Sequence, residues 1–143
     1  MLRLMREGFR TFDHTGDLGL EVWADDPARL YALAAEGLMA QVIEAPAGAA
    51  ELVAAVELEG DDPADLLVAW LNAVLLESEL RHAVWTRASI TTLTATRLAG
   101  TLEGELRDPG RHTYLREVKA VSHHALELTL GPGACRARLV LDI

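Results

Sequence analysis

The residue types best suited to chemistry stand together in one short polar segment, Asp13-His14-Thr15-Gly16-Asp17. The segment separates two apolar runs, so we expect it to be a five-residue connection between two strands. Calcium and magnesium take oxygen ligands from carboxylates and main-chain carbonyls, and loops supply both. The pattern is therefore compatible with a cation site. The commoner structural alternative is an Asx-type turn, in which the aspartates accept hydrogen bonds from nearby backbone N–H groups.

A second acidic feature lies at the end of the printed sequence, where an apolar strand ends in Asp142 and Ile143. We expect the terminal carboxylate of Ile143 to lie beside the Asp142 side chain, which brings two negative groups onto adjacent residues. Terminal residues often fray into solvent. An aliphatic last residue in a strand instead favours an ordered end.

The remaining candidates give weaker signals. His123 and His124 are adjacent, so on a strand their side chains point to opposite faces and at most one can join a given site. Lys119 is the only lysine in the chain, and a lysine on a strand is more often a solvated surface residue than a functional one. The sequence contains no zinc-ligand spacing, phosphate-binding glycine loop, dinucleotide turn or nucleophile elbow.

Composition restricts the class of protein. The chain has 143 residues, of which 50% are hydrophobic and 24% charged. These values are typical of one soluble globular domain, which we expect to span 1–143. No apolar run is long enough for a membrane helix, and the first residues do not form a signal peptide. A single cysteine, Cys135, excludes an internal disulfide framework, and we predict a cytoplasmic protein.

The chain is acidic, with 13 Lys and Arg against 22 Asp and Glu and a net charge of −9. Binding to nucleic acid requires the neutralisation of many phosphates, so this balance disfavours a stand-alone nucleic-acid-binding protein. It suits a protein that binds a cation or is steered towards a basic protein surface. The alternative is that the acidic residues only keep the protein soluble.

Hydrophobic periodicity predicts the elements that must position these residues. In order, we expect strands at 8–12 and 18–24, a helix at 27–43, a strand at 51–59 and a helix at 63–81. Asp26-Pro27 and Asp62-Pro63 have the residue types favoured at the N-cap and first position of a helix. The broad apolar stripe around Leu71 predicts that the second helix is the more buried one.

After residue 84 the pattern is typical of strands only. We expect strands at 88–96 and 97–107, a long strand near 114–130 that bends or breaks at His123-His124, and a last strand at 134–142. The order β-β-α-β-α followed by about four strands defines an α+β fold, a mostly antiparallel sheet with two amphipathic helices.

These segments together resemble a known family. The segment 12–17 (Phe-Asp-His-Thr-Gly-Asp), followed by an apolar strand and an amphipathic helix, is similar to the opening motif of the archease family. Segments 70–72 (Trp-Leu-Asn), 117–121 (Glu-Val-Lys-Ala-Val) and 140–143 (Val-Leu-Asp-Ile) fit the family in the same order, so the resemblance covers essentially the whole chain. The sequence departs from the family at Gly16, where Ala is usual, and at His123, where Tyr is frequent.

The resemblance implies a function. Archeases are accessory proteins of the GTP-dependent tRNA-splicing RNA ligase, and they promote formation of its histidine–GMP intermediate and its repeated turnover. In the family a divalent cation, which is calcium in crystals, is bound by residues that fall here on Asp17, Asp142 and Ile143. The family lysine that falls on Lys119 is implicated in activity. Asp13 and His14 belong to the same opening motif and form a second tier of candidates.

The resemblance further implies a protein that is not itself an enzyme. It would dock on the ligase, reach nucleic acid only through the ligase, and have no contact with membranes. The alternative is a metal-dependent hydrolase with Asp17 and Asp142 as ligands and His14 as the base, and a deep pocket lined by apolar and convergent polar groups would favour it. A calcium-binding structural module is a third reading, and an exposed acidic site at the rim of the sheet favours the accessory protein.

Overall fold

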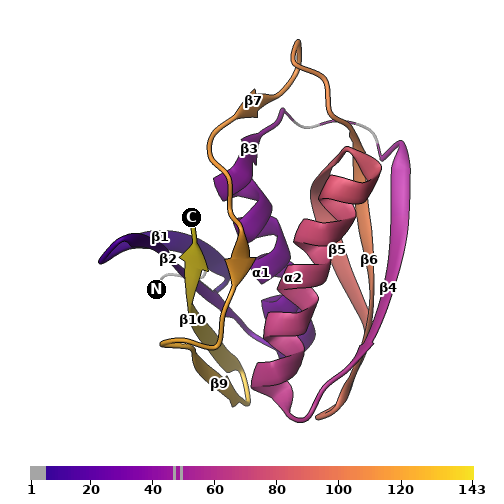
Figure 1. The fold of residues 1–143 in the computed structure, drawn as a ribbon. Helices are drawn as coiled ribbons and strands as arrows, with labels where there is room; N and C mark the ends of the chain where they lie inside the picture. Colours follow the sequence, from indigo (N-terminus) through magenta and orange to yellow (C-terminus); the bar gives the residue numbers. More distant parts are fainter. Residues whose placement is uncertain (1–5, 47, 49) are drawn as a thin grey trace.

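The computed structural model describes residues 6–46, 48 and 50–143, and in this part of the chain two helices lie between two antiparallel sheets (Figure 1). The first sheet has the order β1 (Gly8–His14), β2 (Asp17–Ala24), β10 (Ala134–Asp142) and β8 (Ala120–Val121), and β9 (Glu127–Gly131) also pairs with β10. The second sheet has the order β4 (Leu52–Glu59), β6 (Arg97–Leu106) and β5 (Ala83–Leu93). A short pair joins β3 (Ile43–Glu44) to β7 (Thr113–Tyr114).

The predicted α+β class is confirmed, and both helices begin where the sequence indicates. Helix α1 (Pro27–Val42) is capped by the Asp26 side chain, which accepts a hydrogen bond from the Arg29 N–H at 2.8 Å. Helix α2 (Pro63–Arg81) is capped in the same way by Asp62. Each cap satisfies one of the unpaired N–H groups at the helix start, and the proline that follows has no N–H to satisfy.

The polar segment 13–17 differs from the prediction. It is not a five-residue connection, because β1 continues to His14 and β2 begins at Asp17, and the two residues pair directly. Only Thr15 and Gly16 form the turn, and Gly16 has a φ of 74°, a left-handed value that glycine adopts without steric cost. The tight turn therefore places His14 and Asp17 opposite each other on neighbouring strands.

The C-terminal half also departs from the expected strands. The long strand near 114–130 is not continuous, and only the short strands β7, β8 and β9 form within it. The predicted interruption at His123-His124 is confirmed, since both residues lie in the connection between β8 and β9. Strand β10 has the predicted bounds.

The prediction that the second helix is the more buried one is wrong. Ten of the 16 residues of α1 are buried, against seven of the 19 residues of α2. Small residues on α1 permit close approach on several sides, and a Cβ placed on Gly37 would lie 2.9 Å from the ring of Phe9 on β1. Helix α1 is therefore the central element of the core.

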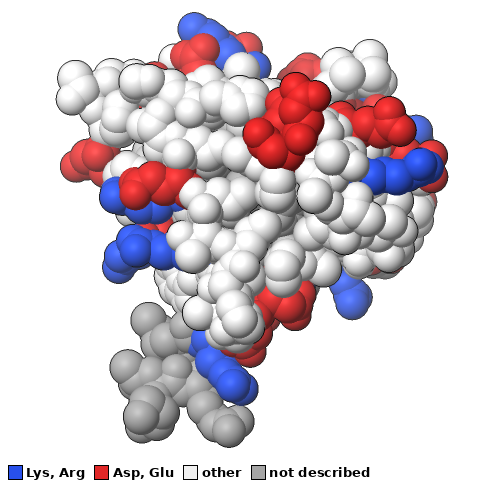
Figure 2. Space-filling model, turned by 90° about the horizontal axis from the view of Figure 1, so that it is seen from below, with Lys and Arg blue, Asp and Glu red and all other residues white. Residues whose placement is uncertain are grey.

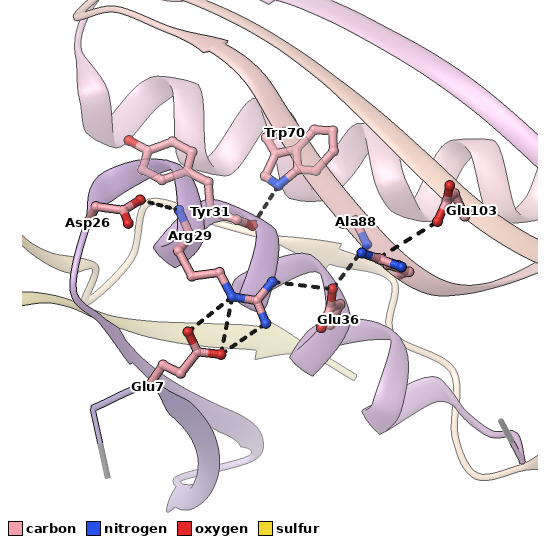
Figure 3. A network of polar contacts seen from close by, with 9 residues as sticks. Glu7, Asp26, Arg29, Tyr31, Glu36, Trp70, Ala88 and Glu103 are labelled. Carbon is pink, nitrogen blue, oxygen red and sulfur yellow. Dashed lines mark hydrogen bonds and ion pairs between the residues drawn. The ribbon is translucent and has the colours of Figure 1, made fainter. Parts of the chain in front are cut away.

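A network of polar contacts ties α1 to its neighbours (Figure 3). The buried indole of Trp70 on α2 donates to the main-chain oxygen of Tyr31 at 2.9 Å. The Glu36 carboxylate accepts from the Ala88 N–H of β5 at 3.0 Å. These contacts fix α1 against the second helix and the second sheet. Neither helix in the described residues is long and apolar enough to cross a membrane.

Candidate functional site

The two acidic segments identified in the sequence meet at one end of the first sheet. The last strand, β10, is the neighbour of β2 rather than of the first strand, and Leu141 pairs with Leu18. Asp142 and Asp17 lie one step beyond this pair, on adjacent strands. Both alternate with residues whose side chains enter the core, so their own side chains lie on the outer face of the sheet.

Strand β8 holds the end of β10 from the other side. Ala120 pairs with Asp142, and the Lys119 N–H donates to the Asp142 main-chain oxygen at 2.7 Å. The Lys119 side chain is exposed. Lys119 is thus attached to the acidic end through its backbone, while its side chain remains exposed.

Asn72 on α2 fixes β8 in turn. Its Nδ2 donates to the Val121 main-chain oxygen and its Oδ1 accepts from the Val121 N–H, both at 2.9 Å. The sequence predicts no role for this residue, although an amide within the apolar stripe that contains Trp70 is a signal of one. Asn72 therefore acts as a positioning residue for Lys119 and Asp142.

His14 lies beside Asp17 on the same outer face. Its Nδ1 is 3.9 Å from Asp17 Oδ2, too far for a hydrogen bond, and it is buried without a hydrogen-bond partner among the described residues. The ring of His124 meets that of His14 edge-on, with centroids 6.0 Å apart. His123 instead lies 3.3 Å from Asp65 of α2. Only one residue of the histidine pair therefore approaches the acidic end.

The other candidates are placed less centrally. Asp13 pairs with Leu18, so its side chain lies on the face of β1 opposite to His14 and Asp17. Ile143 follows Asp142 directly and is 42% exposed. Asp17, His14 and Asp142 thus share one face at the sheet end, whereas Asp13 does not.

This donor set fits a hard divalent cation only in part. In residues 6–46, 48 and 50–143, no group of three His, Cys, Asp or Glu side chains is placed to hold a metal ion. Two carboxylates with main-chain oxygen atoms are donors that calcium accepts, but calcium takes about six to eight oxygen ligands. The remaining ligands would have to come from water or from a partner.

Cavities lie elsewhere in the molecule. One of about 520 Å³ is lined by residues that include Tyr31, Pro63 and Leu93, at the start of the two helices and the end of β5. Another, of about 260 Å³, is lined by Asn72 and Lys119. Neither is lined by Asp17, His14 or Asp142, which therefore form a site at the rim of the sheet.

Acidic and basic side chains are interspersed on the face that is seen from below in the orientation of Figure 1. Figure 2 shows Asp and Glu side chains in separate groups around a broad uncharged area, several of them beside Lys or Arg side chains. The acidic residues are thus not gathered into one patch on this face. Net charge alone consequently does not define a binding surface here.

The chain is a small α+β protein in which two helices lie between two antiparallel sheets and the first sheet has an acidic end. The chain matches the model of the Archease protein family (MTH1598/TM1083) over residues 9–143 and belongs to the archease family. It is 31% identical to the protein archease of Methanopyrus kandleri, over 92% of this chain and 96% of that protein. It is 27% identical to the protein archease of Pyrococcus abyssi, over 92% and 96% of the two chains.

Solved structures agree with this assignment. Protein 1598 of Methanobacterium thermoautotrophicum has a TM-score of 0.77 and 26% identity, over 95% of this chain and 99% of that one. A Thermotoga maritima protein described as an archease and possible chaperone has a TM-score of 0.59 and 16% identity, over 94% and 96%, and supports the fold. The family resemblance of the sequence is confirmed.

Proposed function

We propose that this chain is an accessory protein of a GTP-dependent tRNA-splicing RNA ligase and that it promotes guanylylation and repeated turnover of the ligase. The observation that carries the proposal is the convergence of Asp17 and Asp142 on one exposed sheet end in a member of the archease family. In this role the protein acts in the cytoplasm and contributes no catalytic residue of its own.

The proposed site holds a divalent cation, with calcium as the first candidate. The carboxylates of Asp17 and Asp142 and the terminal carboxylate of Ile143 are its ligands. The unpartnered Nδ1 of His14 supports a site that is completed by a further atom. A rim position supports sharing of the ion with a partner, because the chain's own ligands do not fill a coordination shell.

The chain's own residues have distinct parts in this proposal. Asp17 and Asp142 bind the ion and concentrate negative charge, which suits docking against a basic ligase surface. Asn72 and the Lys119 N–H keep the end of β10 in place. The exposed Lys119 ammonium is available to an anionic group of the ligase or its nucleotide. A divalent ion in such a site supplies positive charge that can offset the charge of a triphosphate.

The hydrolase alternative has less support. A hydrolytic site of this kind needs a pocket that holds substrate against the metal and the base. His14 and the two aspartates line neither of the cavities of about 520 and 260 Å³. Lys119 lines the cavity of about 260 Å³, and its exposed side chain suits contact with a partner.

The proposal is tested by measuring ligase–GMP formation with limiting ligase and substoichiometric accessory protein. The wild-type chain should raise the rate, and Asp17→Ala or Asp142→Ala should abolish this effect. Lys119→Ala should reduce it. Glu57→Ala removes an exposed carboxylate from the second sheet and is the matched control.

Two results would contradict the proposal. An unchanged rate with the wild-type chain would remove the ligase as partner. Nucleotide hydrolysis by the purified chain alone, lost in His14→Ala, would establish the hydrolase instead. Stimulation by Asp17→Ala equal to that of the wild type would leave the accessory role but remove the cation site from it.

A further inference from the structure

Three arginines surround one buried glutamate on the outer face of the first sheet. Arg10 on β1 and Arg138 on β10 lie on either side of Glu21 in one row of the sheet, and Arg136 lies two residues along β10. Arg10 Nε donates to Glu21 Oε1 at 2.6 Å, and Arg136 donates to Oε2 through Nε and a terminal nitrogen. Arg138 Nε lies 3.9 Å from Oε2. We call Arg10, Arg136 and Arg138 the arginine ladder.

The ladder carries surplus positive charge at an exposed surface. Glu21 is only 3% exposed, whereas the side chains of Arg10 and Arg136 are 68% and 57% exposed. Burial alone would raise the pKa of the Glu21 carboxyl, but the hydrogen bonds and charges of Arg136 and Arg10 outweigh it and lower the pKa. One carboxylate thus lies against three cations, and among the described residues only Glu127, 3.6 Å from Arg138, offsets them further.

Aromatic rings support the guanidinium groups from below. The guanidinium of Arg138 lies 4.2 Å from the centre of the Phe12 ring, and that of Arg10 lies 5.9 Å from Trp23. The Phe12 ring in turn occupies the space over Gly19, where an added Cβ would come within 2.3 Å of the ring. Cation–π attraction favours a guanidinium over the face of an aromatic ring. Planar cations and aromatic rings on an open sheet are the groups on which unstacked RNA bases stack.

The ladder and the acidic sheet end share one face. Along β10 the outward residues are Arg136, Arg138, Val140 and Asp142, and along β2 they end at Asp17. Four residues of a strand span about 13 Å, so Arg138 lies roughly that far from Asp142. A ligand on the ladder would therefore extend directly towards the acidic end.

We propose that the arginine ladder binds single-stranded RNA, with the outer N–H groups of the guanidinium groups on phosphates and bases stacked on the guanidinium groups that lie over the Phe12 and Trp23 rings. This goes beyond the proposed function, in which RNA is reached only through the ligase. The net charge of −9 opposes binding by the rest of the molecule, so the contact is weak and acts on RNA held locally. An acidic protein segment would pair with the arginines but would not need the rings.

Tryptophan fluorescence provides a direct test. Trp70 and Trp85 are buried, at 0% and 3% exposure, and Trp23 is only partly buried. Titration with a single-stranded RNA of about 12 nucleotides, within the usual site size, should quench fluorescence, and Trp23→Phe should remove most of that change. Three phosphate contacts predict a slope of about −2 for log K against log salt concentration.

The decisive variant is Glu21→Gln/Arg136→Gln/Arg138→Gln. It removes the buried carboxylate together with two of its partners, so no unpaired charge is left buried, and thermal unfolding checks that it folds. We expect about a tenfold loss of RNA affinity at low salt and a slope reduced by about 1.4, at about 0.7 per lost contact. The matched control, Arg87→Gln on β5, changes the net charge by the same amount and should bind as the wild type does.

Three outcomes would overturn the inference. The first is unchanged affinity in the triple variant, and the second is equal binding of double-stranded RNA. The third is equal binding of an acidic peptide of the same charge with no effect of Phe12→Leu, which would assign the ladder to a protein partner. Failure of ligase stimulation leaves the RNA titration unaffected, and Asp17→Ala should bind RNA normally, so the two proposals fail separately.

Discussion

Residues at the sheet end differ in how they can contribute to the site, because successive side chains of a strand lie on opposite faces of the sheet. Asp13 and Asp17 occur in one motif and have the same chemistry. Only Asp17 shares its face with His14 and lies beside Asp142 on the neighbouring strand. The sequence indicated that both aspartates matter. The spacing of the motif did not separate them, and only the family resemblance ranked Asp17 above Asp13, because the separation depends on a two-residue turn and on pairing with a strand more than 100 residues away.

Asp17→Asn should weaken calcium binding at least tenfold, whereas Asp13→Asn should change it less than threefold. The first removes a carboxylate from the shared face, and the second removes one from the opposite face. Titration calorimetry measures both affinities. Thermal stability should lose its calcium dependence only in Asp17→Asn, because a ligand stabilises the folded state through its binding site. Equal losses in both variants would contradict the geometric assignment.

The role of Ile143 can be tested without removing an acidic side chain. Deleting Ile143 moves the terminal carboxylate onto Asp142, and adding one glycine after Ile143 converts that carboxylate into an amide. Both changes should weaken calcium binding in calorimetry. Replacement of Ile143 by Val keeps the carboxylate and is the control. Full affinity in the extended chain would remove the Ile143 carboxylate from the ligand set.

The lowered pKa of Glu21 predicts how the free energy of unfolding depends on pH. Its pKa lies below the ordinary value of 4.5, because the effects of Arg136 and Arg10 outweigh that of burial. A lowered pKa in the folded state contributes stability above pH 4.5 that is lost as the pH falls through the folded pKa. The free energy of unfolding, measured with denaturant between neutral and acidic pH, should therefore fall less steeply towards low pH in Glu21→Gln than in the wild type. An identical decline in both proteins would exclude this contribution.

At the scale of elements, local signals were predictable and long-range pairing was not. The Asp-Pro pairs defined both helix starts, because capping depends on neighbouring residues only. The strands of the second half proved harder, since β8 has two residues and depends on Asn72 and β10 for its pairing. Nothing in the hydrophobic pattern of 114–130 announces such a dependence. Resemblance to the family supplied the link between the two acidic segments.

Asn72→Leu should loosen β8 without unfolding α2. It removes both hydrogen bonds to Val121 and leaves that residue's buried N–H and C=O unsatisfied, which costs about 1–3 kcal/mol. Hydrogen exchange should increase at the Val121 and Lys119 amides, and ligase stimulation should fall. Glu79→Gln on the same helix is the control. Unchanged exchange at Val121 would show that β10 alone holds β8.

At the scale of the whole molecule, the two helices form a middle layer whose apolar side chains pack against both sheets. Residues from both sheets and both helices belong to one cluster of buried side chains. The broad stripe on α2 was visible in the sequence, but the division of the strands into separate sheets was not. A helix that is apolar on several sides can pack against a single sheet or between two sheets. Only the non-local pairing of the strands decides between these arrangements.

Leu71→Ala tests this middle layer. Leu71 is fully buried, so its truncation should cost about 2–5 kcal/mol of unfolding free energy through lost burial and a cavity. Leu80→Ala, on the same helix at 66% exposure, should cost less than about 0.5 kcal/mol. Because one core joins both sheets, fluorescence and far-UV circular dichroism should report coincident denaturant transitions in each variant. Separate transitions in Leu71→Ala would mean that the sheets unfold independently and that α2 stabilises only one of them.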